Sequence, residues 1–297
     1  MPQYRIRHLT RYTYEEPVSV CHNLAHLLPR QSPRHFWSYA DLEISPVPAV
    51  HSERIDYFGN RLTFFAIQEP HRELNVLAKS IVKIEPTGEE NISLFGSPTA
   101  ASWESVRDHM CERLWGDDLE ASQFVYESPG VQATPEVHDY AQVSFTPNRP
   151  IGEALLDLTS RIHHEFVYDT KATTATTTLP EIMNARRGVC QDFAHLQIGC
   201  LRSLGLPARY VSGYLLTVPP PGTARLVGAD ASHAWLSLYI PGHGWLDIDP
   251  TNDLIPSEKH ITIAWGRDFG DVSPLRGVIL GGGKHTIHVS VDVSPLK

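Results

Sequence analysis

Cys190 is the residue of this 297-residue chain whose setting most favours chemistry. It follows Gly188-Val189 and directly precedes Gln191 to Leu204, a stretch that predicts a helix closed by Gly205. A thiol at a helix start faces unpaired N–H groups and the positive end of the helix dipole. That position favours the nucleophilic thiolate, and the same N–H groups could hold an oxyanion. The alternative is that Cys190 is a small buried apolar residue, as most free cysteines are.

The other three cysteines, Cys21, Cys111 and Cys200, have no comparable setting. Cys200 lies ten residues further along the same predicted helix, on a different face and beside Ile198 and Leu201, which predicts a packing role. Four cysteines in a chain of this length rule out a disulfide framework. Only Cys190 therefore remains as a candidate nucleophile.

A nucleophilic cysteine needs an imidazole partner, and the imidazole needs a group that orients it. The chain has 16 histidines, so the presence of a histidine alone means little. His233 stands apart because it follows the small residues Ala231-Ser232 and begins the strand-like segment His233 to Ile240. A histidine at the end of a strand, next to small residues, can face a cleft. We therefore predict that His233 is the partner of Cys190.

Two aspartates, Asp247 and Asp249, lie on one face of the strand that follows. If the loop between the strands has three residues, so that Ile240 pairs with Gly244, Asp249 lies on the same face as His233 and diagonal to it. A four-residue loop would place Asp249 on the opposite face. Turn chemistry alone could also explain Asp249, and the spacing does not separate Asp249 from Asp247 as the orienting group.

Metal and nucleotide sites are poorly supported by the sequence. Cys190, His195 and Cys200 are five residues apart on one predicted helix, so their side chains point in different directions. The chain has no pair of CxxC motifs and no HExxH. Gly281 to Lys284 lacks the spacing of a phosphate-binding loop. We therefore expect no metal and no cofactor.

Short strands are predicted at both ends of the chain, and such elements must position the candidate site residues. The first ninety residues alternate polar and apolar side chains between turn residues, which is typical of a sandwich or barrel. The clearest strand-like segments are Tyr4 to Arg7, Arg11 to Tyr14, Leu62 to Ile67 and Leu74 to Ile84. Val20 to Leu28 fits either a helix or a strand. The tail from Ile261 to Val293 carries further strands.

Helical spacing begins near residue 103. The apolar positions predict a helix from Trp103 to Leu114, with Ser102 as its N-cap, and a second helix from Ile151 to Phe166. Residues 127–150 contain four prolines and are predicted to form a loop or linker. The threonine-rich residues 173–178 are predicted to form a surface loop. Further predicted elements are a short helix at Glu181 to Ala185, strands at Ala208 to Leu216 and Trp245 to Asp249, and a loop at Pro219 to Gly222.

The composition limits the partners and the compartment. Lys+Arg is 25 and Asp+Glu is 34, so the net charge is −9, which argues against non-specific binding to nucleic acid or to an anionic membrane. No apolar run approaches the roughly 18 residues of a membrane span, and no signal sequence is visible at the N-terminus. We expect a cytoplasmic protein with no nucleic-acid or membrane partner, and the oligomeric state stays open.

Four segments of the sequence fit one pattern, and they are Arg187 to Ala194, Leu201 to Tyr214, Ser232 to Trp235 and Gly244 to Asn252. Together they resemble the transglutaminase-like superfamily, and they occur in the order typical of that family. The start of the chain, through Arg11 to Tyr14, Pro17-Val18 and Leu28-Pro29-Arg30, is similar to the β-rich N-terminal region of bacterial transglutaminase-like proteins.

The resemblance implies a catalytic triad of Cys190, His233 and Asp249, the last chosen over Asp247 because it precedes Pro-Thr. It implies an α+β fold with a papain-like core, in which a helix bearing the cysteine packs on an antiparallel sheet, preceded by a β-sandwich-like N-terminal domain. The expected division is a β-rich domain at 1–96, a helical connector and loop at 97–150, and a catalytic core with C-terminal strands at 151–297.

The implied chemistry is acyl transfer through a thioester, most simply by a cysteine peptidase or amidase acting on a peptide or amide substrate, which could be a protein. A protein-glutamine cross-linking enzyme and a non-enzymatic binding scaffold of the same fold are the alternatives. Tyr168 or Gln191 could add an oxyanion donor, and the residues do not decide between them.

Overall fold

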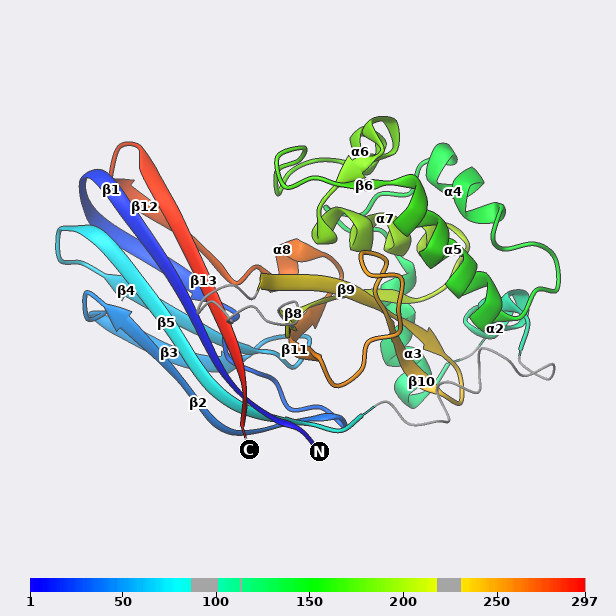
Figure 1. The fold of residues 1–297 in the computed structure, drawn as a ribbon, viewed down its shortest axis with the longest axis horizontal. Helices are drawn as coiled ribbons and strands as arrows, with labels where there is room; N and C mark the ends of the chain where they lie inside the picture. The colour runs from blue at the N-terminus through cyan, green and yellow to red at the C-terminus, as the bar shows by residue number, and fades with distance from the viewer. Residues whose placement is uncertain (87–100, 113, 218–230, 297) are drawn as a thin grey trace, which may run out of the picture.

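The computed structural model describes residues 1–86, 101–112, 114–217 and 231–296, and it has two parts (Figure 1). A curled antiparallel sheet contains both ends of the chain. The second part is a four-stranded sheet surrounded by helices. This arrangement confirms the predicted α+β class.

The N-terminal sheet is organised around one long strand. The first half of β1 pairs with β5 and β13, its second half pairs with β4 and β12, and β2 and β3 lie outside β5 and β4. The seven strands are β1 (Gln3–Ala25), β2 (His35–Ser45), β3 (Val50–Ile55), β4 (Arg61–Ile67), β5 (His71–Ile84), β12 (Leu275–Gly281) and β13 (His285–Leu296).

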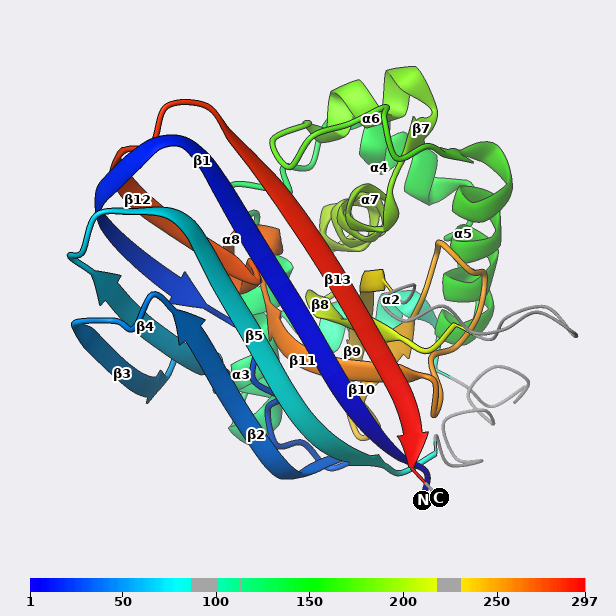
Figure 2. The same cartoon turned by 60° about the vertical axis from the view of Figure 1, so that its left-hand side comes forward.

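β1 changes partners near Pro17, where its register with β5 shifts between Thr13 and Val18. The sheet folds over at this point, so that β5 and β4 lie in two layers that share β1 (Figure 2). A core containing Val18, Phe65 and Val76 fills the space between the layers. The layers thus form the sandwich-like N-terminal part that the alternating sequence indicates.

The C-terminal tail supplies two strands to this sheet. Gln3 pairs with Leu296, so both ends of the chain lie side by side (Figure 2). In the sequence these strands follow the catalytic blocks, and we grouped them with the core at 151–297. A period of two identifies a strand and its buried face but not its neighbour, so the pairing with β1 could not be read from the pattern.

The second sheet carries the predicted site. Its order is β10-β9-β8-β11, all antiparallel. Helix α7 packs on one face, where Ala234, Leu236 and Leu238 of β9 join its apolar side chains in the main core. These elements are α7 (Cys190–Ser203), β8 (Ala208–Leu215), β9 (Ala231–Ile240), β10 (Gly244–Ile248) and β11 (His260–Gly266).

Helices around α7 complete this core, and Ser102 caps α2 as predicted, with its hydroxyl accepting from the Ser105 N–H at 3.2 Å. Gly205 at φ 79° ends α7, also as predicted. The remaining elements are α2 (Trp103–His109), α3 (Gly116–Ser122), η1 (Gln123–Val125), α4 (Pro135–Gln142), α5 (Ile151–Glu165), β6 (Val167–Tyr168), α6 (Leu179–Ala185), β7 (Arg187–Gly188) and α8 (Phe269–Val272).

Helix α4 corrects the prediction that residues 127–150 are only a loop. Thr134 caps this helix, and Pro135 occupies the first turn, where its missing N–H costs nothing. Val137 and Ala141 are fully buried against the core. We interpreted Pro135 as a loop residue because proline breaks helices in their interior, but it also begins them. The predicted loop at Pro219 to Gly222 lies outside the described residues.

An apolar contact joins the two parts of the molecule. Tyr4 and Ile6 of β1 pack with Tyr214 and Ile261 of the catalytic sheet. His8 Nδ1 lies 2.8 Å from the Tyr214 hydroxyl within this contact. In the part of the chain that the structure describes, no helix has the length and apolar character needed to cross a membrane.

Candidate functional site

The start of α7 holds Cys190 in a half-buried position. Asp192, two residues further, turns its carboxylate back so that it accepts from the Val189 N–H at 2.8 Å and from Thr173 Oγ1 at 2.5 Å. Gly188 makes room for this carboxylate, because a Cβ there would lie 2.7 Å from Asp192 Oδ2. Asp192 therefore fixes the turn that presents the thiol.

The hairpin between β9 and β10 has the three-residue loop that the Cys–His–Asp arrangement requires. Ile240 pairs with Gly244, and Gly242 and Gly244 adopt φ of 79° and 83°, which favour glycine. This register places Asp249 on the His233 face of the sheet. The predicted register is therefore confirmed.

His233 and Asp249 meet in a buried network. His233 Nε2 donates to Asp249 Oδ2 at 2.7 Å, and the Asp249 carboxylate is fully buried. The same Oδ2 accepts from His260 Nε2 at 3.0 Å and from Asn252 Nδ2 at 2.7 Å. Oδ1 accepts from the backbone N–H groups of Thr251 at 2.9 Å and of Asn252 at 3.3 Å. A carboxylate with so many donors is held in one orientation.

Asp247, the rival orienting group, is placed elsewhere. Its carboxylate accepts a short hydrogen bond from the Ser237 hydroxyl. Asp249 therefore lies against His233, and Asp247 lies further along the same face.

Electrostatics favours a protonated imidazole at His233. Burial lowers the pKa of His233, but its hydrogen bonds with Asp249 and with Cys190 outweigh burial and raise the pKa to about 10. Burial raises the pKa of Asp249, yet the hydrogen bonds from His233 and His260 hold it well below its ordinary value. Because Nε2 is bound to Asp249, Nδ1 is the ring nitrogen left for Cys190. The structure thus brings His233 and Asp249 into direct contact, and Cys190 acts on the same imidazole.

The other cysteines lack this arrangement. Cys21 and Cys200 are buried, and Cys111 is exposed. Burial raises the pKa of the Cys200 thiol to about 12, which keeps it protonated.

Of the two proposed oxyanion donors, Gln191 directly follows Cys190, and Tyr168 lies on β6 beside the strand that leads into α7. β6 runs parallel to β7, with Tyr168 opposite Gly188, and Tyr168 is half-exposed. Gln191 directs its amide toward the Ala175 carbonyl at 3.5 Å. The Gln191 side chain is thus bound to the threonine-rich loop, whereas among the described residues the Tyr168 side chain has no hydrogen bond to that loop.

A metal ion is the other chemistry that this cluster could support. Possible ligand atoms of His233, Asp249 and His260 lie within 4.8 Å of one another. Metal binding would require both imidazoles to turn a deprotonated nitrogen toward the ion. Both Nε2 atoms instead donate to the Asp249 carboxylate, an arrangement that serves hydrogen bonding.

Sequence reasoning missed two supporting residues. Asp192 could have been found, because an acidic side chain three positions after an N-cap is a recognised helix-start pattern. His260 could not, since it reaches Asp249 from β11, a strand that no motif connects to the site.

Comparison with known proteins shows which family this chain resembles. Residues 4–83 match the bacterial transglutaminase-like N-terminal region, and residues 139–250 match the transglutaminase-like superfamily. An uncharacterised protein of Mycobacterium tuberculosis is 42% identical over 99% of this chain and 93% of its own length. A protein-glutamine gamma-glutamyltransferase of Pseudomonas aeruginosa is 37% identical over 103 residues, which are 33% of this chain and 15% of that protein.

A crystal structure from Cytophaga hutchinsonii, provisionally assigned to the cysteine proteases, superposes with a TM-score of 0.76 at 21% identity. It covers all of this chain and 91% of that one, so the two share a fold. The chain belongs to the transglutaminase-like superfamily. Together these matches support a thiol-dependent enzyme as its general class.

Proposed function

We propose that the protein is a cysteine hydrolase that cleaves an amide bond through a Cys190–His233–Asp249 triad. The observation that carries this proposal is the linked geometry of the three side chains at the start of α7 and at the β9–β10 hairpin. A buried carboxylate that orients an imidazole, which in turn contacts a thiol, has the parts that nucleophilic acyl transfer needs.

The reaction begins with proton transfer from the Cys190 thiol to Nδ1 of His233. The thiolate sulfur attacks the carbonyl carbon of the substrate, and the unpaired N–H groups at the start of α7 stabilise the oxyanion that forms. As the tetrahedral intermediate collapses, the C–N bond breaks and His233 returns its proton to the leaving amine. A thioester then joins the acyl group to Cys190.

Water completes the cycle by attacking the thioester while His233 takes one of its protons. The C–S bond breaks, the carboxylic acid leaves, and the thiol is restored. Throughout both halves, Asp249 keeps Nε2 of His233 hydrogen-bonded and so keeps Nδ1 aimed at the sulfur.

Protein cross-linking is the second candidate, supported by the likeness to the Pseudomonas glutamyltransferase. In that reaction a primary amine replaces water at the thioester, and the first half of the mechanism is unchanged. Product analysis on a glutamine-containing peptide, with and without a saturating primary amine, separates the two. Hydrolysed product alone supports the hydrolase, whereas amine-linked product supports the cross-linker.

Cys190→Ala tests the proposal as a whole. A peptide library incubated with the wild type and with this variant should give cleaved or amine-linked products only with the wild type. Circular dichroism and urea unfolding show whether the variant keeps the fold. Equal product from both proteins would contradict the proposed nucleophile.

A further inference from the structure

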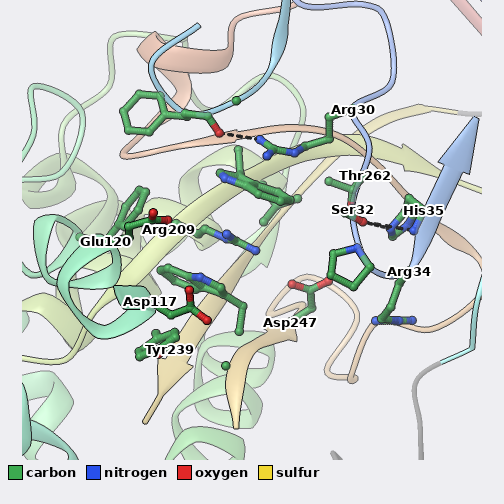
Figure 3. Close-up of a pocket in the computed structure, with 18 of the residues that line it drawn as sticks. Arg30, Ser32, Arg34, His35, Asp117, Glu120, Arg209, Tyr239, Asp247 and Thr262 are labelled. Atoms are coloured by element: carbon green, nitrogen blue, oxygen red, sulfur yellow. Dashed lines mark hydrogen bonds between the residues drawn. The ribbon is translucent and has the colours of Figure 1, made fainter. Parts of the chain in front are cut away.

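A cavity lies on the face of the catalytic sheet opposite α7, and Figure 3 shows side chains that line it. Its volume is about 1020 Å³, in the range of sites for small ligands. Residues following β1, residues of α3 and residues of all four strands β8 to β11 line it, and Cys190, His233 and Asp249 do not. It is therefore a site separate from the triad.

Arg209 of β8 is the central side chain of this cavity. Only 8% of it is exposed, and its guanidinium lies between two aromatic rings, 4.0 Å from the Trp245 centroid and 3.7 Å from the Trp265 centroid. Its Nε reaches the Ser237 hydroxyl at a long 3.5 Å. Its two terminal nitrogens have no hydrogen-bond acceptor among the residues that the structure describes.

The charge of Arg209 is also poorly compensated. Burial lowers the pKa of Arg209, Asp247 opposes this, and Arg30 adds to it. The carboxylate of Asp247 also attracts Arg34 and His35, so one anion serves several groups. In Figure 3, Arg209 reaches toward Asp247 across the cavity, and Arg34 lies beyond that carboxylate.

Two further arginines line the same cavity, and one terminal nitrogen of Arg30 donates to the Phe58 carbonyl at 2.9 Å and to Asn60 Oδ1 at 2.5 Å. Arg30 is 8% exposed and lies on the other face of Trp265, 3.0 Å from the ring centroid. Its Nε is buried without a partner, as is one terminal nitrogen of Arg34. Buried polar groups without partners are costly, and three arginines around one cavity concentrate positive charge that favours an oxygen anion.

The geometry points to a binding site for a small anion, held through a carboxylate or a phosphate group by Arg209 with Arg30 and Arg34. The exposed acids Asp117 and Glu120 line the same cavity and repel extended polyanions, which restricts the ligand to a compact one with a single anionic group. The two indole rings hold the Arg209 guanidinium between them, and its fork can bind two oxygens of the anion at once.

Isothermal titration calorimetry with two probes tests this site, in a low-chloride buffer at neutral pH. N-acetylglycine represents a carboxylate and inorganic phosphate represents the other source. Tryptophan fluorescence gives a second readout, because Trp245 and Trp265 flank Arg209. Tighter binding of one probe identifies which oxygen anion the site prefers, and added chloride should weaken both.

Three arginine variants separate this role from a structural one. Arg209→Met should weaken binding about tenfold or more, and Arg34→Met should weaken it less. Arg54→Met removes an exposed arginine of β3 outside the cavity and should leave the affinity unchanged. If Arg209→Met fails to fold, Asp247→Asn takes its place, because loss of the competing carboxylate should tighten binding.

Absence of heat and of a fluorescence change with both probes on the wild type would overturn the site. Equal affinity in the wild type and the folded Arg209→Met protein would overturn it too, as would an unchanged affinity in both Arg34→Met and Asp247→Asn. Labelling of Cys190 is independent of these measurements, so failure here leaves the proposed hydrolase intact.

Discussion

Asp249→Asn is the perturbation whose effect follows most directly from the structure. The pKa of His233 is raised from 6.5 to about 10, a difference of 3.5 units. At about 1.4 kcal/mol per unit, the folded surroundings of His233, burial included, favour the protonated imidazole by about 5 kcal/mol in total. Asp249 is the stronger of the two groups that raise this pKa, ahead of Cys190.

The asparagine side chain of this variant keeps the shape of the carboxylate but carries no charge. Burial then acts on His233 without its main opposing interaction, so its pKa should fall. We expect the turnover to drop about a thousandfold or more, the scale found when a triad carboxylate is neutralised. The rate of Cys190 alkylation at neutral pH should drop as well, because less of the thiol has passed its proton to His233.

The assay follows iodoacetamide labelling of Cys190 by peptide mass spectrometry across a pH series, alongside turnover on a cleaved peptide. Asp268→Asn is the matched control, because Asp268 is also a buried carboxylate that accepts backbone N–H groups, at Gly130 and Gly270. It should lower stability and leave the pH profile of labelling in place. The reasoning is refuted if Asp249→Asn keeps both the turnover and the labelling profile of the wild type.

Three further predictions concern stability, each measured by urea unfolding. Gly213→Ala should destabilise the protein by about 1–3 kcal/mol, because a Cβ would overlap the Ile261 carbonyl and lie 2.6 Å from the Trp235 ring; a wild-type midpoint would contradict this. The pKa of folded His233 lies above 6.5, so its contribution to the free energy of unfolding should be complete below pH 6.5 and be lost as the pH rises toward 10. The difference in stability between wild type and Asp249→Asn should therefore shrink over that range, and a constant difference would count against this prediction. Leu155→Ala removes a fully buried side chain of α5 and should cost about 2–5 kcal/mol, whereas a loss under about 1 kcal/mol would show that the core refills the space.

Much of the site could be predicted because it depends on local rules. The position of Cys190 at a helix start could be predicted, because Gly205 marks the end of the same helix. The faces of His233 and Asp249 follow from the parity of a hairpin, once its loop length is known. Parity does not separate Asp247 from Asp249, since both lie on one face. The family resemblance favours Asp249, and in the structure Asp249 is the aspartate that accepts from His233.

The rest depends on contacts between distant segments. His260 reaches Asp249 from a strand that lies on the far side of β8 in the sheet, so no spacing relates them. The neighbour of β13 could not be predicted either. Its alternating pattern fits any exposed sheet edge, and in the structure this strand pairs with β1. The cavity around Arg209 is also non-local, because Arg30 and Arg209 lie on opposite faces of one tryptophan, Trp265.

Competitive labelling of the four native cysteines tests the central claim most directly. If exposure alone governed reactivity, the exposed Cys111 would react with iodoacetamide before the half-buried Cys190, and the buried Cys21 and Cys200 would react last. Activation by His233 predicts instead that Cys190 of the folded protein is alkylated first, and that its lead over Cys111 disappears in urea. Labelling of Cys111 ahead of Cys190 in the native protein would contradict the assignment of Cys190 as the nucleophile.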